Sequence, residues 1–135
     1  MSDLTITAAS VKAVAGSINS TGTSGQTITA GQAVYRDATD NKIKLADANS
    51  SLAVAAAVGI SLHGSAADQP IDWVQGGDID LGATLVPGTI YVASGTAGGI
   101  APSADIASGW WVTTLGVATS ASNLKISVFA SGGQL

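Results

Sequence analysis

Alternation of apolar and polar positions is the clearest pattern in this chain. In the segment 42–46 two apolar residues alternate with lysines, and in 124–129 three apolar residues alternate with Lys125 and Ser127. A period of two residues gives a strand one buried side and one wet side. The pattern predicts strands there, and the short apolar runs 33–36, 71–74 and 89–93 are expected to be strands as well.

Two stretches of the chain resemble each other. AGQAVYRDATDNKIKLADA (30–48) and VPGTIYVASGTAGGIAPSAD (86–105) both place a Gly before a short apolar run that contains a Tyr. Tyr35 then matches Tyr91, and Gly59 matches Gly116. We interpret this as two pseudo-repeated β units, 27–77 and 84–133, that cover each other's apolar faces. Chance recurrence in a turn-rich β chain is the alternative. The predicted fold is all-β, a compact small β-barrel or sandwich.

The first 26 residues differ from the rest of the chain. Residues 1–26 are predicted to be an extended N-terminal arm and flexible linker, and residues 27–135 the β domain. Within the arm, 4–7 is expected to be a short strand, and Thr7 is expected to cap a turn or two of helix that ends at Gly16. The segment 17–26 (SINSTGTSGQ) is rich in Ser, Thr and Gly, which is typical of a linker. A few helical residues are also expected near 49–54.

The amino-acid composition favours strands and argues against two classes of partner, nucleic acids and membranes. Of 135 residues, 17 are Gly and nine are Asp, none is Glu, and only 10% are charged. Asp and Gly favour turns, whereas Glu favours helices. The five basic residues form no stripe and the net charge is −4, so no nucleic-acid partner is expected. The longest apolar run, 52–62, is too short to span a membrane.

Candidate catalytic groups are few. His63 is the single histidine, there is no Cys, and no serine lies in a Gly-x-Ser-x-Gly turn. Asp78 and Asp80 share one face of a predicted strand near Asp72, but calcium needs more oxygen ligands than these three supply. We therefore expect no catalytic, cofactor-binding or metal-binding residue, and we expect that the protein is not an enzyme.

The tryptophans suggest where a partner would bind. Trp110 and Trp111 are adjacent, so in a strand they would point to opposite faces, one into the core and one outward. Trp73 is expected to face inward. An exposed Trp can anchor a subunit or partner interface, and it can also stack on a sugar. The Ala/Ser/Gly-rich surroundings favour an interface at Trp110 and Trp111.

The chain resembles the head decoration (cement) proteins of tailed bacteriophages. The resemblance rests on the Gly-Gln-x-Val-Tyr opening, on VGISL, and on GTIYV followed by GGIAP, and it extends over nearly the whole chain. It implies a non-enzymatic virion protein, assembled in the host cytoplasm, that stabilises the outer capsid surface by clamping adjacent major capsid proteins. It also implies a homo-oligomer, with a trimer favoured and a dimer as the alternative.

The arm offers a way to bind the capsid. As a hypothesis, its apolar residues Leu4, Ile6 and Val11 would bind in a groove on the capsid, and the linker would connect them to the β domain. The alternative function is a head-fibre or receptor/carbohydrate-binding module that uses an exposed tryptophan.

Overall fold

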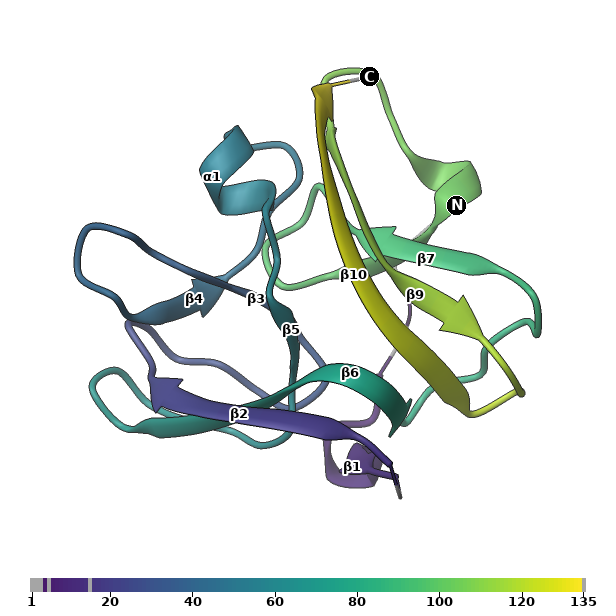
Figure 1. The fold of residues 1–135 in the computed structure, drawn as a ribbon, viewed down its shortest axis with the longest axis horizontal. Helices are drawn as coiled ribbons and strands as arrows, with labels where there is room; N and C mark the ends of the chain where they lie inside the picture. Colours follow the sequence, from purple (N-terminus) through teal and green to yellow (C-terminus); the bar gives the residue numbers. More distant parts are fainter. Residues whose placement is uncertain (1–3, 5, 15, 135) are drawn as a thin grey trace.

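The computed structural model describes residues 4, 6–14 and 16–134, and within them the chain is nearly all β (Figure 1). The strands are β1 (Lys12–Ala13), β2 (Ile18–Thr23), β3 (Ala33–Arg36), β4 (Ile43–Leu45), β5 (Gly59–Ser61), β6 (Pro70–Asp80), β7 (Ile90–Ala93), β8 (Ile100–Pro102), β9 (Trp111–Ala118) and β10 (Asn123–Gln134). The helical segments are η1 (Ala8–Ser10), α1 (Leu52–Ala55) and η2 (Ser103–Asp105). The all-β class predicted from the period-two pattern is confirmed.

The two halves of the chain have the same strand order. The hydrogen-bonded path runs β4-β3-β5-β6-β10-β9-β7-β8, and the named strands pair antiparallel. Read from its two ends, the path gives β4-β3-β5-β6 and β8-β7-β9-β10. We call β3–β6 the first unit and β7–β10 the second unit. They meet where β10 pairs with the end of β6, and the sheet curls into a half-barrel (Figure 1).

Matching residues occupy matching places in the two units. Tyr35 in β3 and Tyr91 in β7 are both buried in the main core. Gly59 in β5 and Gly116 in β9 are both crowded by the next strand. A Cβ on Gly59 would lie 2.2 Å from the Val74 carbonyl oxygen, and one on Gly116 would lie 2.1 Å from the Lys125 carbonyl oxygen. Only glycine lets the backbones approach this closely.

The apolar side chains form two cores. The main core lies between the units, and its largest members include Tyr35, Ile60, Ile79, Leu81, Tyr91, Ile100, Leu115 and Leu124. A smaller core belongs to the first unit alone and consists of Ile28, Val34, Ile43, Ile71 and Trp73. The inward orientation expected for Trp73 is correct, because its side chain is only 2% exposed.

An extended N-terminal arm is not confirmed. The Leu4 N–H donates to the Ile100 carbonyl at 2.8 Å, and the Thr7 N–H donates to the Gly82 carbonyl at 2.8 Å. Leu4 and Ile6 are half-buried against the main core, and Val11 belongs to it. The described part of 4–11 therefore packs on the body of the protein. The strand expected over 4–7 is not formed at the described positions, and the expected helix is limited to the single turn η1.

The expected flexible linker is a strand. Residues Ile18–Thr23 form β2, which pairs antiparallel with Pro70–Gly76 of β6. Backbone hydrogen bonds, which the Ser/Thr/Gly composition does not reveal, hold this segment in place. Small residues suit the position, since a Cβ on Gly22 would come within 3.1 Å of the Trp73 ring.

The remaining local predictions are close to the structure. The helix expected near 49–54 is the single turn α1, and Ser51 caps it by accepting the Val54 N–H. Residues 62–69 connect β5 to β6. Across the described residues, no helix is long and apolar enough to cross a membrane.

Candidate interaction surfaces

The largest cluster of charges lies at the tip of the β3–β4 hairpin. Lys44 Nζ lies 2.7 Å from Asp37 Oδ2 and 3.2 Å from Asp40 Oδ2. The hydrogen bond from Lys44 lowers the pKa of Asp37, and the bond to Asp37 raises the pKa of Lys44. Asp37 and Asp40 also accept backbone N–H groups of the same turn. The ion pairs favour the charged forms of Asp37 and Lys44, and together with the backbone hydrogen bonds they stabilise the hairpin turn. This role is structural.

His63 is engaged on both sides of its ring. Its Nδ1 lies 2.9 Å from the Gly64 carbonyl oxygen, and its Nε2 accepts the Asp72 N–H at 3.2 Å. The Asp72 carboxylate lies 3.4 Å from the same Nε2. With Nε2 accepting a backbone N–H, the ring supports the start of β6.

The acidic residues on β6 do not converge. Asp80 Oδ1 accepts the Gly82 N–H at 3.2 Å, whereas Asp72 faces His63 at the other end of the strand. No group of three or more His, Cys, Asp or Glu side chains that could hold a metal ion occurs in the described part of the chain.

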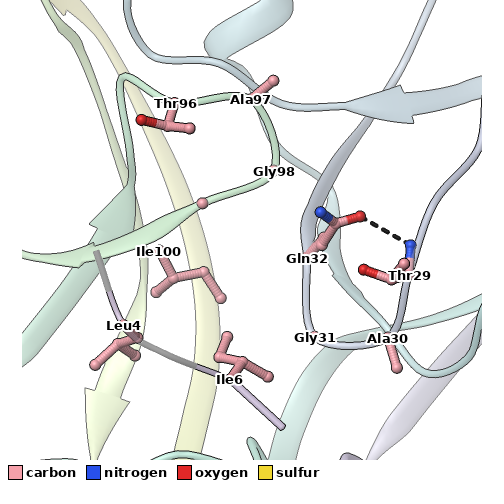
Figure 2. A pocket seen from close by; sticks show the side chains of 11 residues that line it. Leu4, Ile6, Thr29, Ala30, Gly31, Gln32, Thr96, Ala97, Gly98 and Ile100 are labelled. Atoms are coloured by element: carbon pink, nitrogen blue, oxygen red, sulfur yellow. Dashed lines mark hydrogen bonds between the residues drawn. The ribbon is translucent and has the colours of Figure 1, made fainter. Parts of the chain in front are cut away.

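The three apolar residues predicted to bind a groove on a partner instead contact this protein. Leu4 and Ile6 line a pocket of about 260 Å³ between the first unit's turn at 29–32 and the second unit's turn at 96–99 (Figure 2). In that pocket the Thr29 N–H donates to Gln32 Oε1 at 2.8 Å. Val11 is buried in the main core. In this conformation all three side chains pack against residues of the same chain.

Trp110 and Trp111 are both half-buried. The Trp110 ring lies against the backbone of Gly95, where a Cβ would come within 2.5 Å of it. The Trp111 N–H donates to the Ala48 carbonyl at 2.8 Å, which ties the start of β9 to the first unit. The structure therefore places neither ring fully in the core.

Charge is distributed unequally between the two units. The chain has five basic and nine acidic residues, and only Asp105 and Lys125 follow Asp80. Among the described residues, the second half of the chain also holds three of the five exposed large apolar side chains: Val86 (63% exposed), Ile90 (46%) and Phe129 (66%). Depletion of charge together with exposed aromatic and aliphatic groups is typical of the centre of a protein interface.

Strand pairing places Ile90 and Phe129 on one surface. Ile90 on β7 pairs with Val117 on β9, and Thr114 on β9 pairs with Phe129 on β10. Directly paired residues lie on the same side of an antiparallel sheet. The pairing register of β9 shifts between Gly116 and Thr114, and this bulge keeps Thr114 and Val117 on one face although they are three residues apart. We call this surface, formed by Ile90, Thr114, Val117 and Phe129, the outer face of the second unit.

The sequence itself carries a signal for this surface. In 124–129 the buried positions are Leu124 and Ile126, so Phe129 falls in phase with Lys125 and Ser127 on the wet side. A large aromatic residue at a wet position is informative because it remains exposed after folding. The drop in charge after Asp80 is equally visible in the sequence.

Comparison with known proteins gave no match: no protein-family model matches the chain, and no curated protein is similar to it at a significant level.

Proposed function

We propose that the protein is a structural virion protein that decorates and stabilises the outer surface of a tailed-phage capsid by clamping adjacent major capsid proteins. The role is non-catalytic, and the protein would be assembled in the host cytoplasm. The resemblance in sequence pattern supports the choice of partner. The outer face of the second unit is the observation that carries the proposal, because it is uncharged apart from Lys125 and exposes Ile90 and Phe129.

The geometry suits attachment to a second, neutral protein surface. Burial of apolar area contributes about 25 cal/mol per Å² before the costs of association are subtracted. A face of three paired strands is held rigid by its hydrogen bonds, so little ordering entropy opposes docking. The charge-rich first unit would then face solvent, where its Asp and Lys side chains keep the particle surface soluble.

Substitution at the outer face should weaken attachment. Phe129→Asp places a charge on the proposed contact surface, and we expect the affinity for tailed-phage heads assembled without this protein to fall about tenfold or more. Because Phe129 is 66% exposed in the free chain, the substitution should leave the melting temperature nearly unchanged. Cosedimentation of purified protein with undecorated heads measures the affinity.

The matched control is Leu52→Asp. Leu52 is an apolar residue of the first unit that is 46% exposed, and the change adds the same charge away from the outer face. We expect its binding to equal that of the wild type. Equal losses for the two variants, or full binding by Phe129→Asp, would contradict the assignment of this face to the capsid contact.

A further inference from the structure

The outer edge of β2 is open. Residues Ile18–Thr23 pair with β6 on one side. Among the described residues, no backbone hydrogen bond reaches β2 from any strand or loop other than β6. A six-residue edge therefore presents backbone N–H and C=O groups to solvent, which is a template for another strand.

The two strands at the ends of the hydrogen-bonded path, β4 and β8, are covered by the chain itself. Beside β4, the Gly25 N–H donates to the Ile43 carbonyl at 2.7 Å, and the Leu45 N–H donates to Gln26 Oε1 at 2.9 Å. Beside β8, the Leu4 N–H donates to the Ile100 carbonyl at 2.8 Å. Both ends of the strand path thus have internal partners, whereas among the described residues the outer edge of β2 has none.

β2 also lacks two of the devices that protect an edge, charged side chains and proline, although its register shifts between Ile18 and Asn19. Its sequence, INSTGT, has no charged residue and no proline. Asn19, Thr21 and Thr23 are exposed, while Ser20 and Gly22 are half-buried on the opposite face. Small neutral side chains leave room for a strand to approach, and nothing along the edge repels one.

We propose that β2 pairs with β2 of a second copy of this chain, antiparallel and about a twofold axis, so that two sheets join into one. A twofold contact must be self-complementary, because each residue meets its own segment. β2 meets this condition: it carries no charge in a chain whose net charge is −4, so like charges do not face each other across the pair. A charged partner strand would instead be matched by opposite charges on the edge, and β2 carries no charge.

This proposal goes beyond the capsid-binding role and does not rest on it. The contact uses no residue of the outer face of the second unit. Self-association is measured on the purified chain without any capsid, so its failure and the failure of capsid binding are distinguishable.

The test is the mass of the purified full chain by light scattering over a wide dilution series. We expect twice the mass of one chain at high concentration. Asn19→Lys/Thr21→Lys places four lysines on one face of the joined strands, and we expect the mass of a single chain at every concentration. The control Ala121→Lys/Ser122→Lys adds the same charge in the exposed β9–β10 turn, and its mass should stay doubled.

The proposal is overturned if the wild type has the mass of one chain or of three chains, or if the β2 variant has a doubled mass. It is also overturned if the turn variant or Phe129→Asp loses the doubled mass. If circular dichroism shows that the β2 variant is unfolded, hydrogen exchange on the wild type decides. We expect the β2 amides to gain protection as concentration rises, and unchanged exchange overturns the proposal.

Discussion

Trp73→Ala is expected to lower the free energy of unfolding by about 3–5 kcal/mol. Trp73 is the largest member of the first unit's own core, and its side chain is 2% exposed. The ring lies between Gly22 on β2 and Gly59 on β5, and the Arg36 guanidinium lies over it, 5.7 Å from the ring centroid. Truncation would leave a cavity that three rigid strands cannot close. Urea unfolding followed by circular dichroism measures the change.

The conservative control for this prediction is Trp73→Phe. The Trp73 Nε1 is buried and has no hydrogen-bond partner among the described residues, so replacing the indole by a phenyl ring removes an unsatisfied donor along with some volume. We expect a clearly smaller loss than for Trp73→Ala. A loss below about 1 kcal/mol for Trp73→Ala would show that this core contributes little to stability.

Gly116→Ala is expected to destabilise the protein by about 1–3 kcal/mol or more, although it adds only one methyl group. A Cβ at this position would lie 2.1 Å from the Lys125 carbonyl oxygen and 2.9 Å from its carbonyl carbon. Both obstacles are backbone atoms of β10, so the strands must separate to admit the methyl. The shift of the thermal midpoint relative to wild type measures the effect.

Two further glycines make this experiment informative. Gly59→Ala should lower the stability of the protein by a similar amount. Gly59 occupies the equivalent place in the first unit, where a Cβ would lie 2.2 Å from the Val74 carbonyl oxygen. Gly64→Ala is the control, since its nearest neighbour would lie at 3.6 Å, which is ordinary contact distance. If Gly116→Ala were as stable as Gly64→Ala, the close approach of β9 and β10 would be wrong.

The strands that the sequence pattern predicts well are those that are held in place by the burial of their apolar side chains. In 43–45, 71–74 and 124–126, buried apolar residues at a period of two match the observed strands. The matched pairs Tyr35 with Tyr91 and Gly59 with Gly116 carried enough information to predict two similar units. Each of these residues is constrained by burial or by a close backbone approach, and such constraints leave a mark on the sequence.

The prediction of a flexible linker before the β domain was wrong for a physical reason. β2 is held by backbone hydrogen bonds to β6, and INSTGT carries no hydrophobic period that would indicate a strand. Composition alone therefore indicated a linker. In the same way, the sequence does not reveal the contacts of Leu4 and Ile6, because their partners Ile100 and Gly31 are distant in sequence.

Three surfaces of the protein differ in their chemistry. The charged hairpin of the first unit carries paired Asp and Lys side chains and suits contact with water. The open edge of β2 is neutral and polar, which suits a second copy. The outer face of the second unit is apolar and nearly uncharged, which suits a neutral partner such as the capsid surface we propose.

The central claim is that this chain is a component of the outer shell of a tailed-phage head. Quantitative mass spectrometry of gradient-purified particles tests it most directly. The account predicts that the chain remains with the particles and is present at a fixed ratio to the major capsid protein. Particles that contain the major capsid protein but none of this chain would contradict it.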